Sequence, residues 1–176
     1  MTDLRADAAP AVPAVPAVPA TPAAPAPRTL LAAALAAFVV IFNLGYVFHE
    51  LLLHGWVQEQ LGGVARAEYI VPLVALAFAA YVVILSYLYP MFRRAHPAWS
   101  AARAGLVFGL LMGFLWDGLQ GGLIEYATMR ISLLSFVVDS TYHTLEGGLA
   151  GVIIAAVYRR AERRAGALAG HPRPPR

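Results

Sequence analysis

Long apolar runs separated by short polar ones dominate the chain between residues 29 and 160. Four runs reach the roughly 20 residues that a helix needs to cross about 30 Å of hydrocarbon, and they cover residues 30–53, 69–89, 104–127 and 131–158. Helices satisfy every backbone polar group internally, which lipid cannot do. The pattern therefore predicts an all-α fold, an integral membrane four-helix bundle with antiparallel, up-down helices. We expect Pro90 to close the second span.

Two segments of different composition flank this domain. Residues 1–28 repeat Ala, Val and Pro, and such spacing of proline favours an extended, disordered tether. Residues 161–176 form an Arg-rich tail, which is typical of the cytoplasmic flank of a membrane helix. We expect both tails to be disordered and cytoplasmic. Because the positive-inside rule accounts for the Arg cluster, the cluster does not indicate a nucleic-acid partner.

The positions of the Arg residues set the expected orientation. One side of the membrane receives most of them: Arg28, Arg93, Arg94, Arg103, Arg159, Arg160, Arg163 and Arg164. The other side receives only Arg66 and Arg130 near the helix ends. Positive residues gather on the cytoplasmic side of membrane helices. The sequence therefore predicts a multi-pass protein of the cell inner membrane, surrounded by the lipid bilayer, with both termini in the cytoplasm.

The composition narrows the chemistry. Sixty per cent of the residues are apolar, 13% are charged and none is Cys. Disulfides, thiol catalysis, iron–sulfur clusters and Cys-ligated zinc are therefore excluded. A bound metal would have to use His, carboxylate or backbone oxygen ligands.

Small residues recur every four positions on the third and fourth spans. Gly105, Gly109 and Gly113 share one face of the third span, and Gly147 and Gly151 share one face of the fourth. Faces of this kind let two helices approach closely. We expect an intramolecular contact between the two spans, although the Gly105/Gly109/Gly113 face also suits a homo-oligomer or a membrane partner.

Ionisable residues are unusually dense inside these apolar spans. Such residues are costly in a bilayer and face the bundle interior with partners. Asp139, His143 and Glu146 follow the spacing i, i+4, i+7, which is one helical face. Imidazole with carboxylate suits zinc, iron, copper or manganese. The candidate ligands of a divalent transition metal are Asp139, His143 and Glu146, supported by His49, Glu50 and Asp117; Gln120, Tyr126, Ser140, Tyr142 and Thr144 are available to support them.

Three other hypotheses fit the same residues. The cluster can be a packing network of paired or protonated groups in a structural or partner-binding membrane subunit. It can also be a proton or ion pathway. A haem held axially by His49 and His143 is a weaker hypothesis, because carboxylates are unusual neighbours of a porphyrin. No arrangement of residues defines a catalytic centre, and a non-enzymatic role is favoured.

Overall fold

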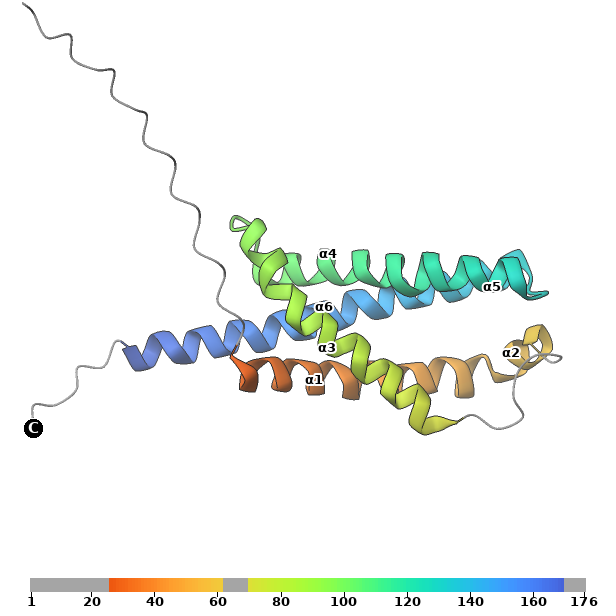
Figure 1. Ribbon diagram of the computed structural model, residues 1–176, viewed down its shortest axis with the longest axis horizontal. Coiled ribbons are helices and arrows are strands. Elements are labelled where there is room, and N and C mark those ends of the chain that lie inside the picture. Colours follow the sequence, from red (N-terminus) through yellow and green to blue (C-terminus); the bar gives the residue numbers. More distant parts are fainter. Residues whose placement is uncertain (1–25, 62–69, 170–176) are drawn as a thin grey trace, which may run out of the picture.

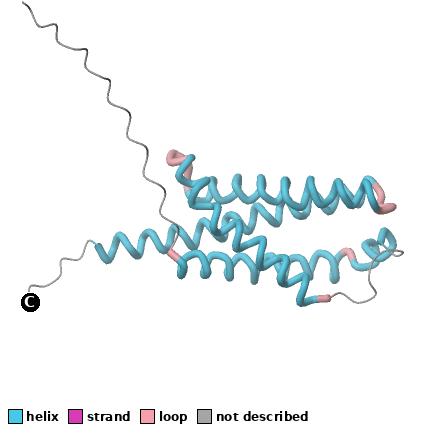
Figure 2. The backbone as a smooth tube through the Cα atoms, viewed as in Figure 1, coloured by secondary structure: helices cyan, strands magenta, loops and turns pink. Residues whose placement is uncertain are grey.

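The described part of the computed structural model, residues 26–61 and 70–169, is all-helical, as the sequence predicts. It forms five helices (Figure 2). Two of them contain wider π-helical turns, labelled η. One continuous helix therefore consists of α1 and η1, and another consists of α4, η2 and α5. The elements are α1 (Pro27–Tyr46), η1 (Val47–Leu52), α2 (His54–Leu61), α3 (Val71–Ala95), α4 (Ala101–Gly113), η2 (Phe114–Gly121), α5 (Gly122–Thr128) and α6 (Leu133–Ala169).

Three of the helices are long and apolar enough to cross a membrane. They cover Pro27–Leu52, Val71–Ala95 and Ala101–Thr128. Each presents many large apolar side chains on its outer surface, as lipid-facing helices do. The longest helix, α6, has 37 residues, but its polar residues lower its hydropathy below that of the other three.

Helix α6 is the element around which the others are arranged. Figure 1 shows α4 lying along α6, with α1 on the other side and α3 crossing diagonally over them. The side chains at the centre are small or branched, so the helices pack closely: Ala33, Ala37, Ile41, Val82, Leu85, Ala150 and Ile154 are all almost completely buried.

The predicted glycine contact between the third and fourth spans is confirmed as an intramolecular one. A Cβ atom added to Gly109 would collide with the carbonyl oxygen of Gly147, and one added to Gly147 would lie 2.6 Å from the carbonyl oxygen of Gly109. Gly105 faces Gly151 in the same manner. The pairing runs in opposite directions along the two helices, so α4 and α6 are antiparallel. Backbone therefore lies directly on backbone, which only glycine allows.

Pro90 does not end the second span, contrary to the sequence prediction, because α3 continues to Ala95. Proline within a helix deprives the carbonyl four residues earlier of its partner. That carbonyl belongs to Ser86, a fully buried residue. The hydroxyl of Tyr158 on α6 donates a hydrogen bond to it at 2.8 Å. A side chain of the neighbouring helix α6 thus replaces the missing backbone donor, and α3 continues beyond the proline.

The helix ends also differ from the prediction at the C-terminus. Residues 161–169 continue α6, so the prediction of a disordered tail is wrong for that segment. Its Ala, Arg and Glu residues are strong helix formers, and no proline follows until Pro172. The predictions for residues 1–25 and 170–176 lie outside the described residues.

Candidate metal centre

Three potential ligands from two distant parts of the sequence converge between η1 and α6. Nε2 of His49 lies 3.3 Å from Oδ1 of Asp139, and Nε2 of His143 lies 3.6 Å from Oδ2 of the same carboxylate. One ligating atom from each residue can be chosen so that all lie within 4.8 Å of one another. A single ion can therefore contact all three after small side-chain movements.

Local helix geometry accounts for this convergence. Asp139 and His143 are four residues apart on α6, so they lie on one face. His49 comes from η1, where the wider π-helical turn shifts the register of its side chains relative to those of α1. Such turns inside α-helices are frequent at functional sites. The sequence spacing gave no indication of this turn.

Each imidazole is held through its other nitrogen. Nδ1 of His49 lies 3.1 Å from the carbonyl oxygen of Gly45, and because that oxygen can only accept, the nitrogen must carry the proton. Nδ1 of His143 lies 3.1 Å from Oε2 of Glu146. Hydrogen bonds of this kind, to a backbone carbonyl or a carboxylate, orient most metal-binding histidines and raise their basicity.

Glu146 and Tyr142 form the support behind His143. The hydroxyl of Tyr142 donates to Oε1 of Glu146 at 2.7 Å, and the Glu146 side chain is only 4% exposed. The ring of Phe48 stacks on Tyr142 with centroids 3.8 Å apart. Tyr142 is among the supporting residues that the sequence indicated, whereas Gly45 and Phe48 were missed. The position of Gly45, four residues before His49, is the signal that could have found it.

The other candidate ligands are placed differently. Glu50 pairs with His54 at 3.1 Å, and the two side chains are 26% and 55% exposed. This pair is separate from the convergent group. The side chain of Asp117 lies outside the described residues. A haem held axially by His49 and His143 would have to lie between the two imidazoles. The Asp139 carboxylate occupies that position.

The electrostatics of the convergent group require a positive species. With both Nδ1 atoms protonated, the two Nε2 atoms present lone pairs toward the Asp139 carboxylate. Electron-rich atoms facing one another in a half-buried setting repel unless a cation lies between them. That cation can be a metal ion or a proton on one of the three groups. Metal binding and proton binding are the two chemical capabilities of this arrangement.

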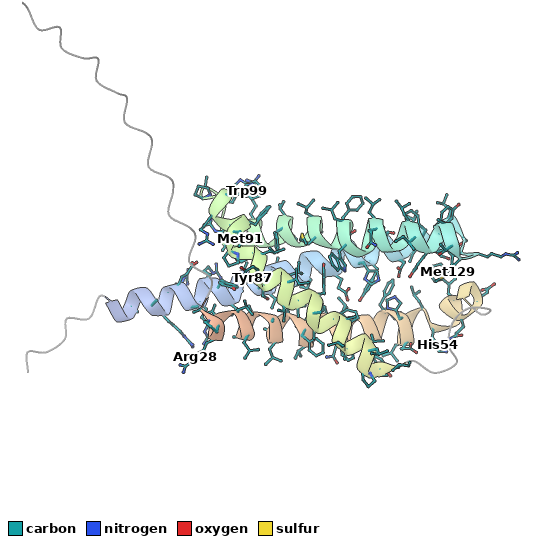
Figure 3. All side chains as sticks on the ribbon, in the orientation of Figure 1. Arg28, His54, Tyr87, Met91, Trp99 and Met129 are labelled. Carbon is teal, nitrogen blue, oxygen red and sulfur yellow. The ribbon has the colours of Figure 1, made fainter. Side chains whose placement is uncertain are left out.

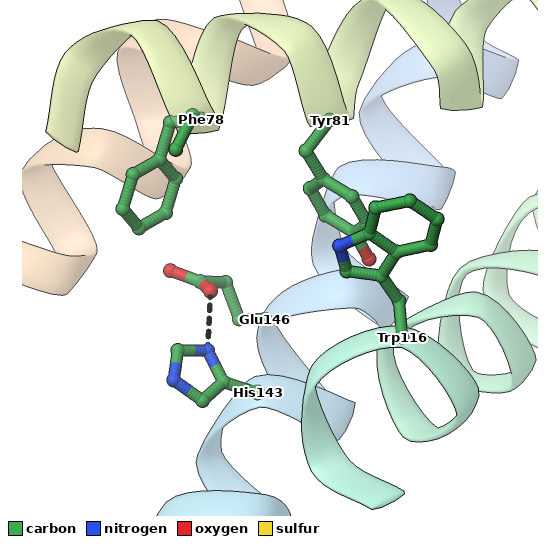
Figure 4. Close-up of a pocket in the computed structure, with 6 residues that line it drawn as sticks. Phe78, Tyr81, Trp116, His143 and Glu146 are labelled. Atoms are coloured by element: carbon green, nitrogen blue, oxygen red, sulfur yellow. Dashed lines mark hydrogen bonds and ion pairs between the residues drawn. The ribbon is translucent and has the colours of Figure 1, made fainter. Parts of the chain in front are cut away.

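A cavity of about 170 Å³ adjoins this group (Figure 4). Its walls are Ala77, Phe78 and Tyr81 of α3 and Trp116 of η2, and its base is formed by His143 and Glu146 of α6. Trp116 is 53% exposed. Phe78, Tyr81 and Trp116 are not among the residues that the sequence indicated, so the aromatic wall was missed.

Comparisons with known proteins do not assign the chain to a family. It matches no family model, no curated protein and no solved structure. The fold and the site by themselves define a class: a helical protein that can span a membrane with three apolar helices and that carries a His–Asp–His group capable of holding a metal.

Proposed function

We propose that the chain is a four-span protein of the inner membrane that binds a divalent transition metal through His49, Asp139 and His143. One observation carries the proposal: both Nε2 atoms face one carboxylate while each Nδ1 is held by an acceptor. This is the arrangement that second-sphere acceptors give to metal-binding histidines.

The fourth span in this proposal is α6. Its apolar half lies against α4 through bare glycine backbone, while Asp139 faces His49 and His143, and Glu146 is buried. Polar groups in a membrane helix are tolerated when they face the bundle with partners. With α6 included, the chain is an antiparallel four-helix bundle.

The proposed orientation follows from which groups share an end of the bundle. Figure 3 shows Arg28 and Trp99 at one end and His54 and Met129 at the other. Arg93, Arg94 and Arg103 flank the loop that carries Trp99. The positive-inside rule assigns this end to the cytoplasm. The His–Asp–His group then lies in the outer half of the membrane.

Charge balance supports a divalent ion. With neutral imidazoles, Asp139 and Glu146 together carry two formal negative charges, and a divalent cation makes the assembly neutral in a medium that penalises net charge. Imidazole and carboxylate ligands suit zinc, iron, copper or manganese. Three protein ligands also leave a position for water or another small ligand.

A proton pathway is the second candidate function. The observation that favours it is a continuous chain of contacts from Tyr142 through Glu146, His143 and Asp139 to His49. In this case protons take the place of the metal.

The Gly105/Gly109/Gly113 face is covered by α6. Two copies could associate through this face only if α6 left it, so we favour a contact within one chain over a homo-oligomer.

The proposal is tested by elemental analysis of detergent-purified protein after incubation with zinc, iron, copper or manganese. Wild type is compared with the double variant Asp139→Ala/His143→Ala. The matched control is Glu50→Ala/His54→Ala, which removes another His/carboxylate pair with i, i+4 spacing. We expect near-stoichiometric metal in the wild type and the control, and none in the first variant.

Thermal unfolding and gel filtration establish that each variant is folded. Wild-type protein without metal under all four conditions would contradict the proposal and leave the proton pathway. Equal metal in the Asp139→Ala/His143→Ala variant would also contradict it, because the ion would then be bound elsewhere.

A further inference from the structure

The cavity beside the metal centre combines an aromatic wall with a charged base. Figure 4 shows Phe78, Tyr81 and Trp116 around a space whose base holds Glu146, with His143 bonded to it. His143 therefore belongs to both the cavity and the His–Asp–His group. A molecule in the cavity would contact a residue that holds the metal.

The size of the cavity suits a small ring. A cavity of about 150 Å³ admits benzene, so one of about 170 Å³ admits a single substituted six-membered ring. Aromatic walls favour a planar ring, because offset or edge-on contacts between rings are attractive. Two of the three aromatic walls, Phe78 and Tyr81, come from α3, and α3 is apolar enough to span the bilayer. Ala77 of α3 lines the cavity and is exposed, so an occupant that enters past it from the bilayer has to be lipid-soluble.

The base of the cavity selects a hydrogen-bond donor. An ionised carboxylate offers about four acceptor sites, and the described contacts of Glu146 with Tyr142 and His143 use two of them. A hydroxyl group on the ring can donate to the acceptor capacity that is left. A charge-assisted hydrogen bond of this kind is stronger than one between neutral groups.

A charged occupant is disfavoured by the metal. Aromatic walls around a carboxylate can also hold an organic cation. With a divalent ion bound, however, Asp139 and Glu146 are already neutralised, and a second cation beside them would be repelled in a low dielectric. This step rests on the proposed metal site. A neutral donor meets no such repulsion.

We propose that this cavity binds a neutral, lipid-soluble phenol or hydroquinone, whose hydroxyl donates to Glu146 and whose ring lies among Phe78, Tyr81 and Trp116. The ligand occupies a site next to the metal centre and enters from the membrane. The inference concerns binding alone and assigns no reaction.

The experiment measures binding of a tritium-labelled hydroquinone with a short alkyl tail to metal-loaded protein in nanodiscs. The test variant is Ala77→Phe, which places a ring in the cavity from its own wall. Its matched control is Ala80→Phe on the same helix, an exposed residue that does not line the cavity. Phe78→Leu is a second test variant that removes one aromatic face. Neither test position is a candidate metal ligand.

We expect Ala77→Phe to weaken binding about tenfold or more, Phe78→Leu to weaken it several-fold, and Ala80→Phe to leave it unchanged. Wild-type protein that binds no hydroquinone would overturn the inference, as would equal binding by Ala77→Phe and Ala80→Phe. Binding of tetraethylammonium that Ala77→Phe abolishes would overturn it in favour of an organic cation.

Metal content measured on the same samples separates this inference from the proposed function. Metal present without hydroquinone binding contradicts the cavity inference alone. Hydroquinone binding that depends on Ala77 in protein that never takes up metal contradicts the proposed function alone.

Discussion

Helix α6 makes two unlike contacts along its length. At Gly147 and Gly151 it meets the backbone of α4 directly. One to two turns earlier, at Asp139 and His143, it meets η1 through ionisable side chains. The first contact depends on shape and the second on charge.

The difference separates stability from chemistry on one helix. The glycine contact has no group that can gain or lose a proton, and it fixes how close α4 and α6 lie. In the polar contact, side chains lie between η1 and α6, and a cation is needed to balance their electron-rich atoms. The two contacts meet at His143, whose backbone carbonyl packs against Gly113 of α4. Gly151 lies about two turns further along α6, so a change at Gly151 should leave the polar contact largely intact.

The largest expected effect is on the glycine contact. Gly151→Ala places a Cβ where the backbone of Gly105 and Gly109 lies, so the helices must separate. We expect the free energy of unfolding to fall by about 3 kcal/mol, measured by denaturant or thermal unfolding in detergent.

Gly166→Ala is the matched control for this change, because a Cβ there meets nothing within 4 Å. It should leave stability unchanged or raise it by up to about 1 kcal/mol, since alanine is the better helix former. Equal losses in the two variants would contradict the distinction between the two regions.

The next effect concerns the support behind His143. Glu146→Gln keeps the shape of the side chain and removes its charge. We expect metal affinity to fall by about 10- to 100-fold, measured by competition with a chelating indicator. The free energy of unfolding should change more with metal present than without it. A stability loss that is the same in both conditions would assign Glu146 to packing instead.

A smaller effect is expected where α6 crosses α3. Tyr158→Phe removes the hydrogen bond to the Ser86 carbonyl, which Pro90 leaves without a backbone donor. Leaving a buried carbonyl unsatisfied costs about 1–2 kcal/mol. Thermal unfolding should show this loss equally with and without metal, because Tyr158 is remote from the polar contact. Metal-dependent destabilisation would be inconsistent with this account.

The smallest effect is expected at Tyr142. Tyr142→Phe keeps the stacking surface against Phe48 and removes only the hydroxyl that donates to Glu146. The loss of one hydrogen bond, about 1 kcal/mol, should weaken metal binding about fivefold. Chelator competition measures the metal affinity of this variant. The control is Tyr126→Phe, because Tyr126 lies on α5 and has no described contact to the group.

The sequence predicted the glycine contact well because the same four-residue spacing occurs on both helices. Spacing alone determines which residues share a face, and two faces of small residues let their helices approach closely. The helical class and three of the four predicted apolar spans follow with similar ease from run length.

The sequence could not predict the arrangement of the metal centre in the same way. The spacing groups Asp139, His143 and Glu146 on one face, but side-chain rotamers decide that Glu146 lies behind His143. The contribution of His49 depends on the π-helical turn and on the packing of η1 against α6. The passage of α3 through Pro90 depends on Tyr158, which is 68 positions away in the sequence.

Binding of one metal ion by His49 and His143 together can be measured by X-ray absorption spectroscopy of zinc-loaded protein. Wild type is compared with His49→Ala. The account predicts two imidazole nitrogens at about 2.0–2.1 Å from the zinc, reduced to one in the variant. A zinc site without imidazole ligands, or one whose imidazole count does not change in His49→Ala, would contradict it.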